Sequence, residues 1–361
     1  MKGLILCGGK GTQLRPLTYT TPKQLLPVAN RPIAFEVIRR VAEVGIEQAG
    51  VIVSPETGHL LMEAIGDGSH WGISLTYITQ SEPAGLAHAV KVARPFLADS
   101  PFLMLLGDNL FEEDLHEPLA RFRNDSPAAL LVLKQVPDPR RFGVAELDSK
   151  GCCVRLQEKP KSPRTDLAIT GAYFFSPAIH DAILRIRPSW RNELEITDAI
   201  QELVNMGHTV LGHVLQGWWL DTGTREAMLH ANQLALERIP SGKAKGDIRG
   251  HSRIEGTVEL ETGAVVEDSL LLGPVSIQTG CQVKSSTVGP YVSIAAASIV
   301  EGSHVDNSII LDNCSIKGVG LLSHSIVGRN SKVLGEAGTT ASLLLGDHSV
   351  VELQRTKEGR G

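Results

Sequence analysis

The sequence predicts an α/β fold in which a mostly parallel sheet domain, residues 1–240, precedes a left-handed parallel β-helix, residues 241–355. In the first part, short apolar stretches alternate with helical patterns, which is typical of a parallel sheet covered by helices on both faces. In the second part, apolar residues recur about every six positions and realign every 17, which suits three short strands per coil. A chain of 361 residues with 42% hydrophobic residues is long enough for two cores.

Five apolar stretches and four helical patterns define the expected sheet domain. The expected strands are Leu4–Leu6, Gly50–Val53, Leu75–Ile78, Phe102–Leu106 and Ala129–Leu133. The expected helices are Ile33–Val44, Leu60–Ile65, Leu86–Ala93 and Ile196–Met206. Ligands of such sheets bind beyond the carboxyl ends of the strands, so we expect a site at loops Gly8–Gly11 and Gly107–Asn109.

Four files of apolar residues define the expected β-helix. The files are Ile254, Leu271, Val288, Val305 and Leu322; Leu260, Ile277, Ile294 and Leu311; Ile299, Ile316, Val333 and Val350; and Ile309, Ile326 and Leu343. An antiparallel β-domain with accidental spacing is the alternative. This region could be a bystander, an oligomerisation module or a second active site with a histidine base. The available histidines are His251, His304, His324 and His348.

Composition excludes several classes of protein. The net charge is −5 and no stretch is strongly basic, which argues against nucleic-acid binding. No apolar run reaches the ~18 to 20 residues of a membrane span, and the N-terminus enters a strand without a targeting pattern. The five cysteines are scattered, without metal-site spacing, which favours reduced thiols and a cytoplasmic location.

The most informative motif is the glycine turn Gly8-Gly9-Lys10-Gly11, directly after the first expected strand. Glycine adopts positive φ without steric cost, and such turns let backbone N–H groups point at a phosphate. Lys10, Arg15 and Lys23 can add positive charge. Leu14 stands where a dinucleotide fingerprint needs its third glycine, and the spacing does not fit a Walker A loop.

The segments Gly8–Pro16 and Pro22–Val28 together resemble the signature of the sugar-nucleotide pyrophosphorylases, which join a nucleotide to a sugar 1-phosphate. Further landmarks of that family recur in order: Gln80 with Pro83–Ala89, Leu106–Asn109, Phe142–Val144, Glu158–Pro160, Thr170-Gly171, Arg191 with Glu193–Asp198, and Trp219–Gly223. The resemblance covers the first 235 residues, a similar β-helix extends a long subgroup, and a Rossmann-like nucleotidyltransferase fold is implied. One departure is Gln13, where the family has arginine.

The resemblance implies attack of a sugar 1-phosphate on the α-phosphorus of a nucleoside triphosphate, with release of pyrophosphate. Asp108 and Asp221 are the implied Mg²⁺ ligands, because hard carboxylate oxygens suit that ion. The implied catalytic residues are Arg15, Lys23, Lys159 and Asp108. The implied substrate-binding residues are Leu6, Gly8, Gly9, Gly11, Thr12, Gln13, Gln24, Gln80, Pro83, Gly85, Asn109, Gly143, Glu158, Ile169, Gly171 and Arg191.

The expected substrates are dTTP and glucose 1-phosphate. The Gln80 amide can both donate to and accept from a pyrimidine edge, and Gln24 with Gly85-Leu86-Ala87 is more similar to thymidylyltransferases. One methyl group separates thymine from uracil and is worth only ~1 to 3 kcal/mol, so UTP stays open as the donor. A bifunctional uridylyltransferase/acetyltransferase, a non-catalytic regulatory subunit and a guanylyl- or adenylyltransferase are further alternatives. Self-association into a homo-oligomer is expected, without a fixed number of subunits.

Overall fold

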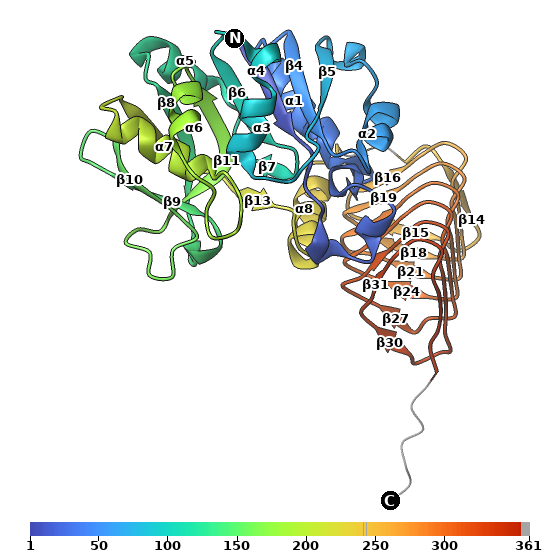
Figure 1. The fold of residues 1–361 in the computed structure, drawn as a ribbon. Helices are drawn as coiled ribbons and strands as arrows, with labels where there is room; N and C mark the ends of the chain where they lie inside the picture. Colours follow the sequence, from blue (N-terminus) through green and yellow to red (C-terminus); the bar gives the residue numbers. More distant parts are fainter. Residues whose placement is uncertain (241, 243, 355–361) are drawn as a thin grey trace, which may run out of the picture. The chain divides into compact units, whose positions relative to one another are not determined.

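The computed structural model describes residues 1–240, 242 and 244–354 (Figure 1). The chain divides into two compact units. The sheet unit consists of Met1–Gly9 and Ile33–Asp221, and the β-helix unit consists of Lys10–Pro32 and the chain from Thr222 onward. The predicted sequence domains, 1–240 and 241–355, differ from these units chiefly at Lys10–Pro32, which contains most of the signature loop.

A nine-stranded, mostly parallel sheet forms the centre of the sheet unit. Its central strands β6, β1, β4 and β5 are parallel neighbours, as the alternating pattern predicted. The strands of this sheet are β1 (Lys2–Leu6), β4 (Gln48–Val53), β5 (Ser74–Thr79), β6 (Phe102–Leu106), β8 (Ala129–Gln135), β9 (Gly143–Leu147), β10 (Cys153–Glu158), β11 (Leu167–Phe175) and β12 (Val210–Val214). A separate antiparallel ribbon joins β7 (Asn109–Phe111) to β13 (Trp219–Asp221). All five predicted strands are confirmed.

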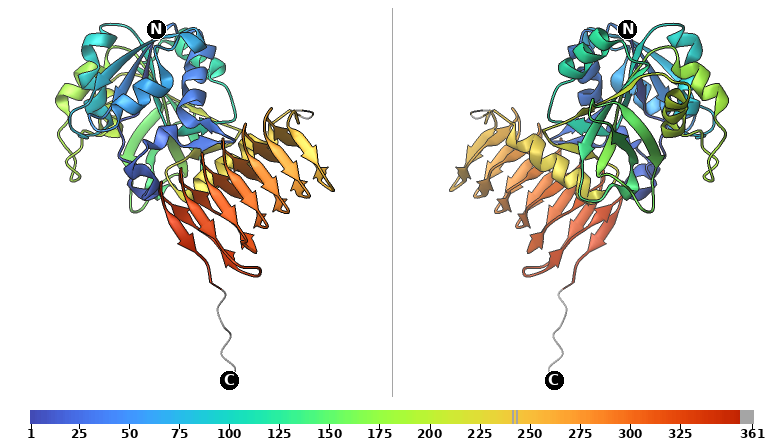
Figure 2. Two further views of the ribbon diagram at one scale, coloured as in Figure 1. Left: turned by 90° about the vertical axis from the view of Figure 1, so that its right-hand side faces the viewer. Right: turned by 90° about the vertical axis from the view of Figure 1, so that its left-hand side faces the viewer.

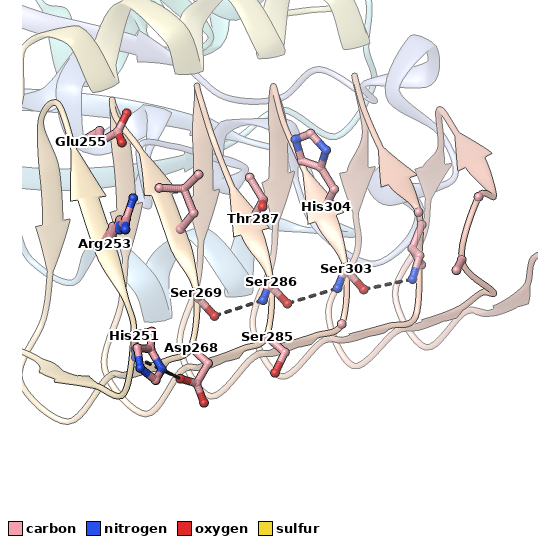
Figure 3. Close-up of a pocket in the computed structure, with 16 residues that line it drawn as sticks. His251, Arg253, Glu255, Asp268, Ser269, Ser285, Ser286, Thr287, Ser303 and His304 are labelled. Atoms are coloured by element: carbon pink, nitrogen blue, oxygen red, sulfur yellow. Dashed lines mark hydrogen bonds and ion pairs between the residues drawn. The ribbon is translucent and has the colours of Figure 1, made fainter.

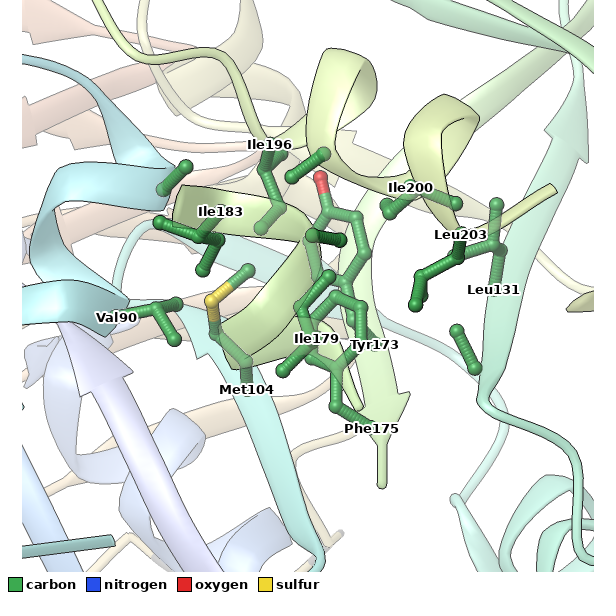
Figure 4. Close-up of a cluster of buried hydrophobic side chains, with 14 of the residues drawn as sticks. Val90, Met104, Leu131, Tyr173, Phe175, Ile179, Ile183, Ile196, Ile200 and Leu203 are labelled. Atoms are coloured by element: carbon green, nitrogen blue, oxygen red, sulfur yellow. The ribbon is translucent and has the colours of Figure 1, made fainter. Parts of the chain in front are cut away.

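The helices of the sheet unit carry apolar faces that complete its core. They are α1 (Ile33–Glu43), α2 (Gly58–Ile65), α3 (Leu86–Val92), α4 (Arg94–Leu97), α5 (His116–Asp125), α6 (Ile179–Arg185) and α7 (Ile196–Asn205). Figure 4 shows Ile179 and Ile183 of α6 beside Ile200 and Leu203 of α7, packed around Tyr173. The four predicted helices are therefore confirmed, with ends that shift by at most two residues. None of the described helices is long and apolar enough to cross a membrane.

The β-helix unit stacks short parallel strands into three sheets, and its coils form a left-handed parallel β-helix (Figure 2). The first sheet contains β14 (Asp247–Arg249), β17 (Val265–Glu267), β20 (Gln282–Lys284), β23 (Ile299–Glu301), β26 (Ser315–Lys317), β29 (Lys332–Leu334) and β32 (Val350–Glu352). The second contains β15 (Arg253–Glu255), β18 (Leu270–Leu272), β21 (Thr287–Val288), β24 (His304–Val305), β27 (Leu321–Leu322) and β30 (Thr340–Ala341). The third contains β16 (Val258–Leu260), β19 (Val275–Ile277), β22 (Val292–Ile294), β25 (Ser308–Ile310), β28 (Ile326–Val327) and β31 (Leu344–Leu345). The antiparallel alternative is wrong.

One of the four predicted apolar files is confirmed in full. Ile254, Leu271, Val288, Val305 and Leu322 pair in register through five coils. The second file is wrong at its end, because Ile294 pairs with Ile310, so this coil has 16 residues and Leu311 falls out of register.

The other two files shift for the same reason. Ile316 pairs with Val300 instead of Ile299, and Val333 pairs with Val351 instead of Val350. In the fourth file, Ile309 pairs with Ser293 on one side and Ile326 on the other, and Leu344 replaces Leu343 as the partner of Ile326. A fixed period of 17 cannot anticipate a coil that is one residue shorter or longer.

The β-helix unit also contains α8 (Arg225–Glu237) and the hairpin of β2 (Pro27–Val28) and β3 (Arg31–Pro32). Thr224 caps α8, since its hydroxyl accepts a hydrogen bond from the Ala227 N–H at 3.2 Å. The helix lies along β22 and β25. Ala29 and Asn30 connect the hairpin strands and both have positive φ, at 45° and 62°, which is the signature of a two-residue type I′ turn.

Candidate active site

The carboxyl ends of β1 and β6 bring the first predicted site residues together. Leu6 pairs in register with Leu106, and the Gly107 N–H donates to the Leu6 carbonyl at 3.0 Å. Because the strands are parallel, Gly8 and Asp108 both leave the same edge of the sheet. The loops Gly8–Gly9 and Gly107–Asn109 therefore meet where ligands of such sheets bind.

The two predicted metal carboxylates come from adjacent strands of the β7–β13 ribbon. Asp221 is paired in register with Asn109, and Asp108 precedes Asn109 in the chain. The Asn109 amide donates to Asp108 Oδ1 at 3.2 Å and accepts from Trp219 Nε1 at 2.6 Å. Asp108 and Asn109 are buried, with 5% and 3% exposure, so these bonds fix their side chains.

This donor set fits Mg²⁺ in its chemistry. The described residues contain no cluster of three or more His, Cys, Asp or Glu side chains with metal-site geometry. Mg²⁺ needs fewer protein ligands than that, because it keeps several waters and binds through one or two carboxylates together with substrate phosphates. A pair of aspartates at a phosphate-binding edge meets this requirement.

Gln80, Pro83 and Gly85 lie on the segment that joins β5 to α3. Gln80 Oε1 is 3.3 Å from the position that a Cβ on Gly8 would take, so the predicted base-reading amide borders the glycine turn. The Gln80 amide nitrogen donates to the Gly85 carbonyl at 3.2 Å and contacts His88 Nδ1 at 2.9 Å. The Gln80 side chain is thus oriented before any ligand binds.

Gly85 is required for packing as well as for its predicted approach to a base. Its φ is 102°, and a Cβ there would lie 2.4 Å from the Leu194 carbonyl oxygen. The Leu194 N–H donates to the Ala84 carbonyl at 2.7 Å. The base-reading segment and the Glu193–Asp198 run are therefore directly joined.

A second group of predicted residues converges around the Glu158 carboxylate at the end of β10. Glu158 Oε2 accepts from Thr197 Oγ1 at 2.7 Å. A Cβ on Gly143 would lie 2.9 Å from Thr197 Oγ1 and 3.1 Å from Ile169 Cδ1. Burial raises the pKa of Glu158, the Thr197 hydrogen bond opposes that rise, and the charge of Glu195 adds to it.

Gly171 connects this group to the metal carboxylates. It lies in a bulge of β11, with φ of 81°, and a Cβ there would be 2.7 Å from Leu106 Cδ1. Leu106 is the last residue of β6 before Gly107 and Asp108. Thr170, beside Gly171, is buried and donates to the Val132 carbonyl at 2.9 Å.

The guanidinium of Arg191 is held by carboxylates. Its Nη2 donates to both oxygens of Glu195 at 2.8 Å, and it also contacts Glu158 at 3.4 Å and Glu193 at 3.3 Å. The bidentate fork that we expected to face a sugar phosphate is directed at Glu195. The sugar-phosphate role of Arg191 stays a prediction, and a phosphate would have to share this guanidinium with Glu195.

Lys159 has an unusual backbone. Its φ is 41°, a conformation that side-chain-bearing residues rarely adopt, and its N–H donates to the Phe142 carbonyl at 3.1 Å. The Phe142 ring meets the Trp219 ring edge-on, with centroids 4.9 Å apart. Through these contacts Lys159 is linked to the strand that ends in Asp221, while its ammonium lies 3.8 Å from Glu158 Oε1.

The remaining predicted residues belong to the β-helix unit. Gly11 has φ of 59° and begins the short helix η1 (Thr12–Leu14), and its carbonyl accepts from Thr18 Oγ1 at 2.7 Å. A Cβ on Gly11 would lie 3.3 Å from Lys23 Cβ. The Arg15 guanidinium stacks over Tyr19 at 4.9 Å, and Gln13 is exposed.

Gln24 carries a buried polar atom that points to a ligand. The residue is 1% exposed, and its Oε1 has no hydrogen-bond partner among the described residues. A buried amide oxygen without a donor costs free energy that a bound ligand can recover.

Three residues that shape the site were quoted in the motifs without being assigned a role. Thr197 and Glu195 hold Glu158 and Arg191, and Trp219 holds Asn109. Their presence in the Glu193–Asp198 and Trp219–Gly223 motifs was the available signal.

A separate hollow of about 540 Å³ lies on the second sheet of the β-helix (Figure 3). His251 Nδ1 is 3.4 Å from Asp268 Oδ1 and fully exposed, while His304 lies at the other end of the hollow. The hydroxyls of Ser269, Ser286 and Ser303 donate to backbone carbonyls of their own coils. This hollow bears on the acetyltransferase alternative, which stays untested.

Comparison with known proteins agrees with the geometry. Residues 2–238 match the family model described as nucleotidyl transferase, and residues 271–356 match the model described as GMPPB C-terminal domain. A glucose-1-phosphate thymidylyltransferase of Streptomyces griseus is 44% identical over 98% of this chain and 99% of its own length. That of Streptomyces antibioticus is 43% identical over 98% of this chain and all of its own.

A solved structure shares the fold of the first part. A Bacillus anthracis protein described as a glucose-1-phosphate thymidylyltransferase, determined in complex with sucrose, has a TM-score of 0.62 and 34% identity. The match covers 67% of this chain and 98% of that protein. Since the family model spans most of the chain and relatives match it from end to end, the chain belongs to the nucleotidyl transferase family, beside glucose-1-phosphate thymidylyltransferases.

Proposed function

We propose that the protein makes dTDP-glucose and pyrophosphate from dTTP and glucose 1-phosphate, with Mg²⁺ as the cofactor. The observation that carries this proposal is the register of the β7–β13 ribbon, which pairs Asp221 with the neighbour of Asp108 at the glycine-turn edge. Two substrates that are both polyanions repel each other, so charge neutralisation and alignment are the main tasks of the site.

In the proposed reaction a phosphate oxygen of glucose 1-phosphate forms a bond to the α-phosphorus of dTTP. The bond from that phosphorus to the α,β-bridging oxygen breaks, and pyrophosphate leaves with the electron pair. Mg²⁺ bound by Asp108 and Asp221 would neutralise phosphate charge. The Asn109 and Trp219 hydrogen bonds support this role, because they restrict the Asp108 carboxylate to one orientation.

The sugar phosphate would be bound by Lys159, with Arg191 beside it. Lys159 is half-exposed and held in a strained backbone conformation, which is common at functional sites. Glu158 would accept hydrogen bonds from sugar hydroxyls in its ionised form, and Thr197 keeps its carboxylate in place. Gly143, Ile169 and Gly171 leave room for the sugar, since a side chain at either glycine would collide with Thr197 or Leu106.

The nucleotide would be bound by the glycine turn and the β5–α3 segment. Gln80 would pair with the pyrimidine edge, beside Pro83 and Gly85, and the unpartnered Gln24 Oε1 would accept a hydrogen bond from the nucleotide. The triphosphate would contact backbone N–H groups of Gly8, Gly9, Gly11 and Thr12, with Gln13, Arg15 and Lys23 around it.

The test is pyrophosphate release from purified protein, Mg²⁺ and glucose 1-phosphate with each of dTTP, UTP, ATP, GTP and CTP. We expect the highest kcat/KM with dTTP. A higher value with UTP would overturn the choice of base, and release with none would favour the regulatory-subunit alternative. Consumption of acetyl-CoA with glucosamine 1-phosphate would favour the bifunctional alternative.

We further propose that the enzyme works in the cytoplasm. All five cysteines are free, which fits a reducing compartment. Self-association into a homo-oligomer stays a prediction that sedimentation of the purified protein tests.

A further inference from the structure

The signature loop Lys10–Pro32 is packed against the β-helix at three points. The hydroxyl of Thr20 donates to Asp347 Oδ2 at 2.7 Å, and Arg329 Nη1 donates to the hydroxyl of Thr21 at 2.7 Å. A Cβ on Gly346 would lie 3.1 Å from Pro16 Cβ, so the loop backbone rests on the same coil. Thr21 is 5% exposed, which shields its bond to Arg329 from water.

The partners of the loop form a connected row on the β-helix, which we call the corner file: Asp312, Arg329 and Asp347. Each follows a strand of the third sheet, β25, β28 or β31, at the same corner of successive coils. Arg329 Nε donates to Asp312 Oδ2 at 3.1 Å, and the Arg329 backbone N–H donates to Asp347 Oδ1 at 2.7 Å. The file is therefore braced within the β-helix before it binds the loop.

The third point is the turn of the β2–β3 hairpin at the end of the loop. Asn30 Nδ2 donates to the Ser276 carbonyl and hydroxyl at 3.1 and 3.0 Å. The Ala29 N–H donates at 2.8 Å to the side chain of Asn232 of α8, which is fully buried. The loop is thus held near its middle and at its end by the β-helix unit.

We propose that the corner file is a positioning device for the nucleotide loop, so that the β-helix sets the affinity of the enzyme for its nucleoside triphosphate. The inference rests on the proposed function for the meaning of the loop. The path is short: Thr20 and Thr21 follow Thr18, whose hydroxyl binds the Gly11 carbonyl, and Gly11 packs on Lys23. Freeing Thr20 and Thr21 lowers the fraction of molecules with a competent loop, and the apparent affinity for nucleotide falls by that fraction.

The test compares Arg329→Met and Thr21→Val with a control variant, Lys317→Met. Lys317 forms an ion pair of 2.9 Å with Glu301 on another sheet of the β-helix, so its loss removes a similar surface pair away from the corner file. We expect Arg329→Met and Thr21→Val each to raise KM for dTTP about three- to tenfold. KM for glucose 1-phosphate and kcat should change less than twofold, and Arg329→Lys should restore part of the loss.

A second readout needs no substrate. In Arg329→Met, amide hydrogen exchange of peptides within residues 10–32 should accelerate relative to the Lys317→Met variant. Equal nucleotide KM in the two variants, or equal exchange in the loop, would overturn the positioning role. If the wild-type protein releases no pyrophosphate with any nucleotide, the proposed function fails, while the exchange measurement still decides the contact between the loop and the corner file.

Discussion

Glu158, Arg191 and Lys159 show what single residues in this site do for one another. Arg191 neutralises Glu195 and part of Glu158, and Thr197 holds the second oxygen of Glu158. The residue types at these positions could be predicted from motifs. Their partners could not, because the sequence does not say which carboxylate an arginine will face once the chain has folded.

Gln13 is the residue at which the chain departs from its family. A charged donor contributes ~1.5 to 3 kcal/mol to binding of an anionic acceptor, so Gln13→Arg should raise kcat/KM for dTTP ten- to hundredfold. The measurement is pyrophosphate release at subsaturating dTTP, with Gln13→Leu as the control for side-chain volume. A Gln13→Arg variant that is no better than wild type would show that the charge is supplied elsewhere.

His180 in α6 should make folding sensitive to acid. Its Nε2 is buried without a hydrogen-bond partner among the described residues, and burial, helped by the charge of Arg94, lowers its pKa to about 4. The unfolded chain, with a pKa near 6.5, then binds the proton more readily than the folded chain. Stability should therefore fall as the pH drops from about 6.5 to about 4, and His180 has no such effect at pH 7.

Replacement of His180 by phenylalanine should remove this loss, which is on the order of 3 kcal/mol. Unfolding by urea at pH 7 and at pH 4.5 measures it. The exposed His251→Phe serves as the control, and identical pH dependence of the two variants would contradict the account.

At the scale of elements, the β-helix shows both the reach and the limit of sequence periodicity. The file from Ile254 to Leu322 was predictable because each coil there has 17 residues. Beyond Ile294 one coil has 16, and the backbone hydrogen bonds follow that change. Register is fixed by local corner geometry, which an average period does not contain.

The serine ladder on the β-helix should stabilise consecutive coils. The Ser286 hydroxyl donates to the Lys284 carbonyl at 2.7 Å and accepts from the buried Ser303 N–H at 3.1 Å (Figure 3). Ser286→Ala leaves that N–H without its acceptor, at a cost of about 1 to 3 kcal/mol. Native-state hydrogen exchange of β21 and β24 should accelerate accordingly, and exchange as slow as in the Thr287→Val control would show that the ladder contributes nothing.

At the scale of the whole molecule, the main surprise is where the signature loop belongs. Lys10–Pro32 is joined covalently to Gly9 and Ile33 of the sheet unit, yet its contacts group it with the β-helix. The bond from Arg329 to Thr21 spans 308 residues of sequence, and no local pattern encodes such a pairing. The two architectures were predictable from texture, whereas this contact depends on the folded β-helix.

The metal carboxylates are the feature on which the proposed enzyme depends. Asp108 and Asp221 were expected to converge although they lie far apart in sequence, and the pairing of Asn109 with Asp221 brings their segments together. The ordered motifs made this predictable, while the ribbon that joins them was not among the expected strands. Their proposed shared task is to hold one divalent cation between two anionic substrates.

The most direct test of that task is single-turnover pyrophosphate release by Asp108→Asn and Asp221→Asn over a range of Mg²⁺ concentrations. Each amide keeps the size of the side chain but removes the charge that the cation needs, so release should slow by at least about a hundredfold, with thermal unfolding unchanged. The exposed Asp99→Asn should behave as wild type. Release at the wild-type rate in either variant, at limiting Mg²⁺, would contradict the two-carboxylate site.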